Sequence, residues 1–272
     1  MAISQNTTHS VLTAMTVWPD ASNLIAQFLA RERRLSYFAL LMIGIAIVFA
    51  LSSTIDVRQW RGVPIWLKPF KFAVSTALFA LTSAWFIGLL PAQVRQSTAV
   101  NYLVWTLILT ASFEVVYIAL QALLGQGSHH NTTDPFHATM FSLMGIAALA
   151  LTATQAALAV LITVYHREVS SAVPALPPEV LAVVIGLWLT FILGSISGFA
   201  LGANQPPEGS GLPVLGWQLA LRDFRPAHFL GIHAHQLIPL AGLMVVSLGL
   251  PSANAWVVGL SVAYTLGWIA CF

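Results

Sequence analysis

The sequence predicts an all-α integral membrane protein, a bundle of about seven transmembrane helices with an N-terminal interfacial helix. Two observations lead to this fold class. Hydrophobic residues make up 58% of the 272 residues and charged residues only 7%, whereas a soluble domain carries about 25% charged residues because its surface faces water. No segment shows the alternation over about ten residues that is typical of a transmembrane β-barrel strand. We therefore expect the lipid bilayer to be the main partner of the chain.

The N-terminal residues 1–35 are predicted to form a tail and an interfacial amphipathic helix. Apolar side chains recur there at helical spacing and a charged, mostly basic cluster follows them, which is typical of a helix that lies in the membrane surface. These residues are Leu24, Ile25, Phe28 and Leu29, followed by Arg31, Glu32, Arg33 and Arg34. A basic tail in solvent is the alternative, because the apolar stripe is short.

Residues 36–272 are predicted to form the seven-helix transmembrane domain. A spanning helix needs about 20 apolar residues, and seven segments are suitable. They are Tyr37–Ile55, Ile65–Leu90, Ala99–Leu124, Pro135–Tyr165, Val180–Leu201, Pro226–Leu250 and Ala253–Phe272. Two helix starts carry a local signal as well. Asp134 precedes Pro135 as a helix cap, and Arg225 precedes Pro226, since proline suits the first turn of a helix.

The distribution of arginines predicts an orientation. Arg31, Arg33 and Arg34 lie next to the first predicted span, and basic residues next to spanning helices favour the cytoplasmic side. We therefore expect a cytoplasmic N-terminus. Seven spans then place the loops after the first, third and fifth helices on the extracytoplasmic side.

Charge and cysteine content exclude two classes of function. The formal net charge is only +2, which gives little electrostatic attraction for nucleic acid, so we expect no nucleic-acid partner. Cys271 is the single cysteine. It therefore excludes an intramolecular disulfide and a multi-cysteine metal site.

Histidines collect on the predicted extracytoplasmic side. Six of the eight histidines fall in or next to its loops: His129, His130, His137, His228, His233 and His235. His228 and His235 are seven residues apart, which places them about 10 Å apart along a helix. They are therefore not expected to share one metal ion. Any single histidine among the six has a simpler alternative role, a hydrogen bond between two helices.

The third predicted helix carries a polar stripe that leads toward the histidines. Thr110, Glu114, Tyr117 and Gln121 are spaced four, three and four residues apart, so they share one helix face. Glu114 is the only carboxylate well inside a predicted span. An isolated charge there is costly, so Glu114 should be paired, protonated or next to a water-filled cavity. Lys68 or Lys71 of the second helix is the expected partner, and a purely structural ion pair is the alternative.

These residue types suggest a membrane-embedded site that binds a metal ion or haem. Histidines with a carboxylate suit iron, zinc or copper, and imidazole is also an axial haem ligand. We expect a redox function, with a quinone or another lipid-soluble molecule as substrate. The expected metal ligands are His129, His137, His228 and His233. The expected catalytic residues are Glu114, Lys71 and Asp223, and the expected substrate-binding residues are Lys68, Arg225, Tyr117, Gln121, Asn131 and Gln236.

Two other functions remain open from the sequence. A zinc-dependent membrane hydrolase would use Glu114 or Asp223 as the base that activates a zinc-bound water. A proton- or ion-coupled transporter or channel would use Lys71, Glu114 and the histidines as a proton or cation pathway, or as an anion-binding pocket. The connection Gly202–Arg225 contains several prolines and glycines and an apolar piece. It is a candidate lid in either case.

Three short pieces of the sequence resemble recurring pieces of uncharacterised bacterial multi-pass membrane proteins. They are Lys68-Pro-Phe-Lys-Phe, Ser128-His-His-Asn and the stretch from Asp223 to Gln236 with the pattern D-x-R-x-x-H-F-x-G-x-H-x-x-Q. The resemblance implies a location in the bacterial inner membrane and a shared site formed by the three pieces. It implies no particular activity.

Overall fold

The computed structural model describes residues 23–169, 175–208, 211–212, 215–218 and 222–272. Seven of its helices are long and apolar enough to cross a membrane. The predicted class, an all-α bundle of seven spanning helices, is confirmed, and the chain is a multi-pass membrane protein. Residues 1–22 of the predicted tail lie outside the described residues.

The spanning helices begin and end close to the predicted limits. They are α3 (Arg33–Ile55), α4 (Leu67–Ile87), α6 (Thr98–Leu123), α7 (Pro135–Val169), α8 (Pro178–Ala203), α9 (Arg225–Ser247) and α10 (Ala253–Ala270). Asp134 caps α7 as its sequence predicts, because its Oδ1 accepts a hydrogen bond from the backbone N–H of His137 at 3.0 Å. This bond satisfies one of the free donors at the helix start.

Four short elements accompany the spans. The short helix α2 (Leu24–Arg31) precedes α3, and a single helical turn, α5 (Ala92–Arg95), precedes α6. That α2 lies in the membrane surface stays a prediction. Strands β1 (Gln59–Trp60) and β2 (Val63–Pro64) form an antiparallel hairpin after α3. The two turn residues of the hairpin have positive φ, 52° at Arg61 and 80° at Gly62. A positive φ at both positions is typical of the tight type I′ turn, which glycine adopts without steric cost.

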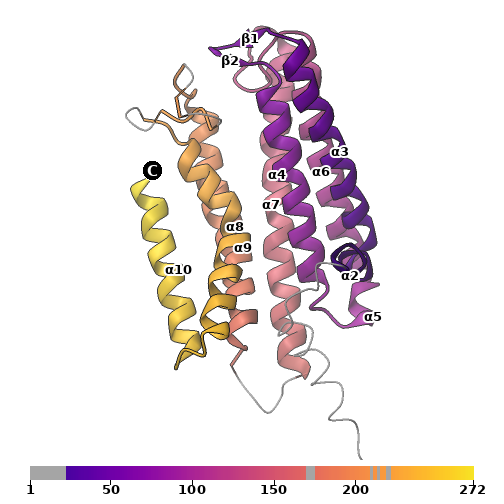
Figure 1. Ribbon diagram of the computed structural model, residues 1–272, viewed down its shortest axis with the longest axis vertical. Coiled ribbons are helices and arrows are strands. Elements are labelled where there is room, and N and C mark those ends of the chain that lie inside the picture. Colours follow the sequence, from indigo (N-terminus) through magenta and orange to yellow (C-terminus); the bar gives the residue numbers. More distant parts are fainter. Residues whose placement is uncertain (1–22, 170–174, 209–210, 213–214, 219–221) are drawn as a thin grey trace, which may run out of the picture.

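The spans divide into two groups. Helices α3, α4 and α6 form one group, helices α8, α9 and α10 form the other, and α7 packs against both α6 and α8 (Figure 1). The largest cluster of buried apolar residues lies mainly in the first group and continues into α7 and α8. Helices α4 and α9 face each other across the division but make few direct contacts. This division leaves room for polar side chains between the two groups.

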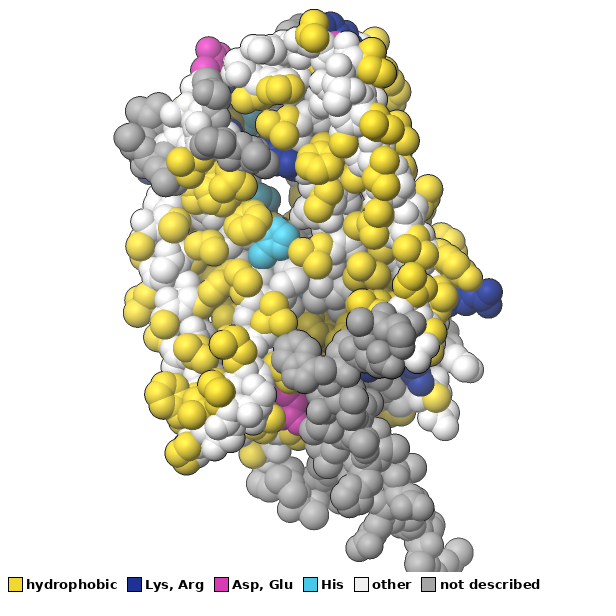
Figure 2. Space-filling view, in the orientation of Figure 1, with side chains coloured by type: hydrophobic (Ala, Val, Ile, Leu, Met, Phe, Trp, Pro, Cys, Tyr) yellow, Lys and Arg dark blue, Asp and Glu magenta, His cyan; other side chains and the backbone are white. Residues whose placement is uncertain are grey.

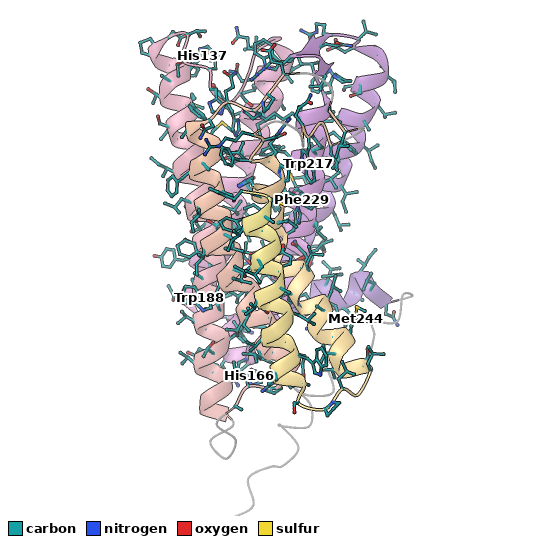
Figure 3. The ribbon with its side chains drawn as sticks, turned by 90° about the vertical axis from the view of Figure 1, so that its left-hand side faces the viewer. His137, His166, Trp188, Trp217, Phe229 and Met244 are labelled. Atoms are coloured by element: carbon teal, nitrogen blue, oxygen red, sulfur yellow. The ribbon has the colours of Figure 1, made fainter. Side chains whose placement is uncertain are left out.

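The loops gather at two ends of the bundle. The connections after α3, α6 and α8 lie at the same end, as expected from seven spans (Figure 1). His137 and His166 mark the two opposite ends of α7 (Figure 3). The histidine-rich loops therefore lie at one end of the molecule, and helix α2 lies toward the other (Figure 1).

Candidate functional site

Lys68 is the centre of the polar site. It lies in the first turn of α4, and its Nζ is 2.9 Å from Ser128 Oγ and 3.0 Å from His129 Nδ1. A lysine ammonium is only a donor, so both neighbours accept its hydrogen bonds. Glu114 and Lys71 also lie close enough to Lys68 to interact with it electrostatically. The site therefore joins α4, α6 and the loop between α6 and α7.

The loop that carries His129 is held in a compact shape. Asn131 Nδ2 donates to the carbonyl of Gly127 at 3.2 Å, and His130 adopts a positive φ of 56°. Burial holds the pKa of His129 well below its ordinary value, and the charges of Lys68, His130 and His228 act in the same direction. The His129 imidazole is therefore neutral at pH 7 and accepts from Lys68. Asn131 stabilises the turn from Gly127 to Asn131 through this hydrogen bond. Substrate binding by Asn131 stays a prediction.

The polar stripe predicted on the third span lies inside the protein. Glu114, Tyr117 and Gln121 of α6 are all buried. Among the described residues, the Tyr117 hydroxyl and Gln121 Oε1 have no hydrogen-bond partner. Buried polar atoms are normally satisfied by protein, water or a ligand. These two atoms therefore indicate a place where a bound water or ligand makes contact.

Lys68 is the cation that interacts electrostatically with the Glu114 carboxylate. Among the residues with described coordinates, no ion pair within 4.0 Å involves either group. The sequence predicts Lys68 or Lys71 as the partner of Glu114. Lys68 lies within electrostatic range of Glu114, whereas Lys71 Nζ donates to the carbonyl of Leu215 at 3.2 Å.

Asp223 and Arg225 form an ion pair directly before and at the start of α9. Arg225 Nη2 lies 2.6 Å from Asp223 Oδ2, and Arg225 Nε lies 2.8 Å from Asp223 Oδ1. Burial raises the pKa of Asp223, but hydrogen bonds from Arg225 and from the backbone N–H groups of Gln218 and Arg225 outweigh it, so the pKa lies below its ordinary value. Asp223 is therefore an ionised anchor for the loop before α9. Arg225 in turn acts electrostatically on Lys71.

The three histidines of α9 have different surroundings. His228 Nδ1 lies 3.4 Å from Ser197 Oγ of α8, and its ring is within electrostatic range of His129 and His233. His233 Nδ1 lies 3.1 Å from Gln236 Oε1. His235 is fully buried. Its Nδ1 lies 3.2 Å from Thr190 Oγ1 of α8, which makes it a contact between two helices.

Close packing of α8 and α9 sets these orientations. A Cβ atom placed on Gly231 would lie 2.7 Å from the backbone nitrogen of Gly194, closer than atoms pack. Glycine is therefore needed at this crossing, and the contact fixes the rotation of α9 that turns His235 toward α8. Gln236 lies on the other side and donates to Thr82 Oγ1 of α4 at 3.3 Å. A second contact joins the same two helices, because the ring centres of Phe79 of α4 and His235 of α9 lie 4.5 Å apart.

The surface is hollowed between the two groups of helices. Figure 2 shows this hollow, with histidine side chains and a lysine or arginine side chain at its walls. The connection after α8 lies near its opening. Arg61 of the hairpin turn donates to the carbonyl of Pro206 at 2.7 Å, and its Nε lies 3.3 Å from Glu208 Oε1. The hairpin and this connection therefore hold each other over the same end of the site.

The predicted metal ligands are not all brought together. His129 and His228 lie within electrostatic range, as do His228 and His233. His137 instead pairs with Asp134 at the exposed start of α7. Within the described part of the chain, no group of three or more His, Cys, Asp or Glu residues is arranged to hold a metal ion. Metal or haem binding stays a prediction.

Two hydroxyl-bearing partners were not predicted from the sequence. Thr190 lies within hydrogen-bond distance of His235, and Ser197 within hydrogen-bond distance of His228. Both lie within a long apolar helix, where a single Ser or Thr commonly bonds to its own helix backbone. Ser128 and Thr82 do carry a signal, because Ser128 directly precedes the histidine pair and Thr82 shares a helix face with Lys68 and Lys71.

Comparisons of the chain with protein-family models, with curated proteins and with solved structures find no match.

Proposed function

We propose that this chain is a proton-coupled carrier that binds a small anionic solute between α4, α6 and α9. One observation supports it above all. The Lys68 ammonium is bonded to two neutral groups, Ser128 and His129, rather than to a carboxylate. Buried charges are normally paired or next to a water-filled cavity. An anionic group of a solute would supply the missing negative charge.

The surrounding charges favour an anion over a cation. Lys71 also bonds to a neutral atom, the carbonyl of Leu215. The Asp223 carboxylate is occupied by Arg225. The Glu114 carboxylate interacts with Lys68, whereas the charge that acts on Lys71 is that of Arg225. A solute anion beside Lys68 and Lys71 would bring the local charge close to neutral, and this lowers the cost of holding charges in the membrane.

Proton coupling follows from the groups around the anion. Glu114 lies near Lys68, and the histidines continue from His129 through His228 to His233. Protonation of Glu114 while the anion is bound would remove the negative charge that acts on Lys68 and strengthen its hold on the solute. The anion and the proton would then move together with little net charge, which avoids the energetic cost of moving a single charge through a low-dielectric region.

The test is proton movement driven by an anion gradient. Protein is reconstituted in liposomes that contain a pH-sensitive dye, and inward gradients of succinate, phosphate and sulfate are applied one at a time. At least one gradient should change the internal pH faster than in protein-free liposomes. Lys71→Gln should reduce this rate to background, and Glu114→Gln should retain anion binding but lose the pH change. Arg222→Gln, an exposed arginine in the loop before α9, is the matched control.

The proposal is wrong if none of the three anions gives a protein-dependent pH change, or if Lys71→Gln transports as fast as the natural chain. Retained pH coupling in Glu114→Gln would remove Glu114 from the mechanism and leave anion binding standing.

The second candidate is the metal- or haem-dependent redox function expected from the sequence. Two pairs of histidines within electrostatic range of each other, His129 with His228 and His228 with His233, support it. Arg225 would then hold an anionic group such as a haem propionate, and a quinone or another lipid-soluble molecule would be the substrate. Elemental analysis of purified protein for iron, zinc and copper is the discriminating measurement. Near-stoichiometric iron that is lost in His228→Ala would favour this candidate, and zinc would favour the hydrolase.

We also propose that the chain lies in the bacterial inner membrane with a cytoplasmic N-terminus. The chain end with the exposed Cys271 lies at the same end of the bundle as the loops after α3, α6 and α8 (Figure 1). A membrane-impermeant maleimide should therefore label Cys271 in cells with a permeabilised outer membrane. Cys271→Ser is the control, and labelling only after cell lysis would reverse the orientation.

A further inference from the structure

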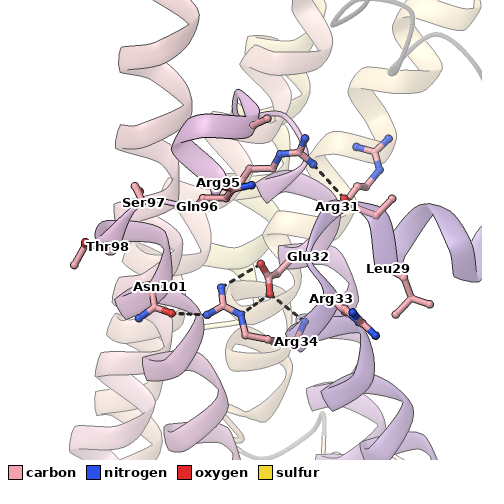
Figure 4. A pocket seen from close by; sticks show the side chains of 12 residues that line it. Leu29, Arg31, Glu32, Arg33, Arg34, Arg95, Gln96, Ser97, Thr98 and Asn101 are labelled. Carbon is pink, nitrogen blue, oxygen red and sulfur yellow. Dashed lines mark hydrogen bonds and ion pairs between the residues drawn. The ribbon is translucent and has the colours of Figure 1, made fainter.

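A second basic region lies toward the opposite end of the bundle. A cleft of about 610 Å³ opens between α2, α5 and the first turns of α3 and α6 (Figure 4). Among the described residues that line it, one is acidic, Glu32, and four are arginine: Arg31, Arg33, Arg34 and Arg95. The lining of the cleft is therefore net positive.

The fold holds three of these arginines in place. The Arg31 guanidinium lies 3.7 Å from the centre of the Trp85 ring. Arg95 of α5 donates to the carbonyl of Ala30 at 3.2 Å, which brings it to the end of α2 (Figure 4). Arg34 lies 2.8 Å from Glu32, so it already occupies the carboxylate of the cleft.

Like charges are close together in this cleft. Burial lowers the pKa of Arg31, and the neighbouring charge of Arg95 lowers it further. This repulsion acts between helices that are far apart in the sequence. An anion placed between the arginines would relieve it, and a guanidinium can hold a phosphate group through two parallel hydrogen bonds.

The position of the cleft indicates which anion reaches it. Helix α3 begins at Arg33 and α6 begins at Thr98, so the cleft lies where the spanning helices leave the apolar layer. Lipid headgroups occupy that depth in a bilayer. Leu24 and Ile25 are exposed at the start of α2, the helix whose other end lines the cleft, as expected for a helix whose apolar side chains enter the membrane surface.

We propose that this cleft binds the phosphate group of an anionic phospholipid, with Arg31, Arg33 and Arg95 around the headgroup and the acyl chains beside α2. A soluble phosphate compound would satisfy the same arginines. The exposed apolar residues of α2 favour the lipid, because a soluble anion gains nothing from them.

The test is native mass spectrometry of the delipidated, detergent-purified chain. Phosphatidylglycerol and phosphatidylcholine with identical acyl chains are titrated separately, and inorganic phosphate is added as a competitor. One phosphatidylglycerol should bind about tenfold more tightly than phosphatidylcholine. Because each basic residue near an anionic membrane surface contributes about a fivefold gain in binding, Arg33→Gln and Arg95→Gln should each weaken phosphatidylglycerol binding by about that factor. Arg222→Gln, an exposed arginine at the other end of the bundle, should leave it unchanged.

Three results would overturn the proposal. One is equal binding of the two lipids, and a second is an equal loss in Arg222→Gln, which would mean unspecific attraction by surface charge. The third is displacement of the lipid by inorganic phosphate at comparable concentration, which would assign the cleft to a soluble anion. Arg33 is exposed, so its variant should fold normally and keep the test decisive. The measurement does not depend on anion transport, so the two proposals fail or succeed independently.

Discussion

The two basic regions of this protein are built from different cations in different surroundings. The inner site uses lysines that donate to a serine, a histidine and a backbone carbonyl. The cleft beside α2 uses arginines that contact a tryptophan ring, a carbonyl and a carboxylate. An ammonium is a compact and strongly hydrated charge, whereas a guanidinium stacks on aromatic rings and is more weakly hydrated. The inner lysines therefore carry the larger unbalanced charge cost and should respond more strongly to a bound anion.

The largest expected effect comes from removing the charge of Lys68. In Lys68→Met, anion binding should weaken by at least about 30-fold, because losing one member of a buried charge pair costs about 2–5 kcal/mol. The thermal midpoint should stay the same or rise, since apolar replacement of a buried charge is often neutral or stabilising. Anion-dependent thermal shifts of the purified variant measure both quantities. A fall in stability without any loss of anion binding would make Lys68 a structural residue.

The next largest effect is expected at the crossing that orients the α9 histidines. Gly231→Ala would press a methyl group against the backbone of α8, and overpacking of this kind costs about 1–3 kcal/mol. Gly145→Ala in α7 is the matched control, because a Cβ atom there meets nothing within 4 Å. The control should be neutral or slightly stabilised, since alanine favours the helix over glycine. Thermal unfolding in detergent compares the two variants, and equal midpoints would show that the crossing is more tolerant than its geometry implies.

The pH dependence of the free energy of unfolding should reflect His129 of the inner site and not Asp223. The pKa of His129 is lowered in the folded protein, so the unfolded chain takes up a proton more readily. Stability should therefore fall as the pH drops below the ordinary histidine value of about 6.5. The pKa of Asp223 also lies below its ordinary value, so this carboxylate remains ionised over the same range and does not contribute to the fall.

Thermal midpoints between about pH 7.5 and pH 5.5 test this dependence. His129→Gln should weaken it, whereas His137→Gln, at the exposed start of α7, serves as the control. An unchanged pH dependence in His129→Gln would mean that His129 is protonated as easily in the folded chain as in the unfolded one.

The sequence predicts the spans well and the short elements poorly. Long apolar segments have few alternatives in a bilayer, so each observed span ends within four residues of its predicted limit. The hairpin at Gln59–Pro64 and the single turn at Ala92–Arg95 have too few residues for a periodic pattern. The Arg61-Gly62 pair is the one local signal for the hairpin.

The site is predicted as a set of residues but not as a set of contacts. The spacing on α6 correctly indicates a buried polar stripe that contains Glu114. It does not decide whether Lys68 or Lys71 approaches Glu114, because that depends on how α4 packs against α6. The pattern from Asp223 to Gln236 leaves His235 out of the expected ligands, but it does not predict the contact of His235 with α8. That contact depends on the rotation of α9, which is set by the close approach of Gly231 to Gly194.

The smallest effect is expected from Arg33→Gln, which tests whether the cleft beside α2 and the inner lysine site act independently. Arg33→Gln changes an exposed residue of the cleft, so the free energy of unfolding should change by no more than about 0.5 kcal/mol.

Anion-driven pH changes in liposomes made only of phosphatidylcholine should also match those of the natural chain, because the inner site lies at the other end of the bundle. In liposomes with anionic lipid the two proteins should differ only if the bound headgroup supports the fold of α2 and α3. A slower anion-driven pH change for Arg33→Gln in phosphatidylcholine alone would show that the cleft and the inner site are coupled through α3 and α4. The two regions would then form one functional site.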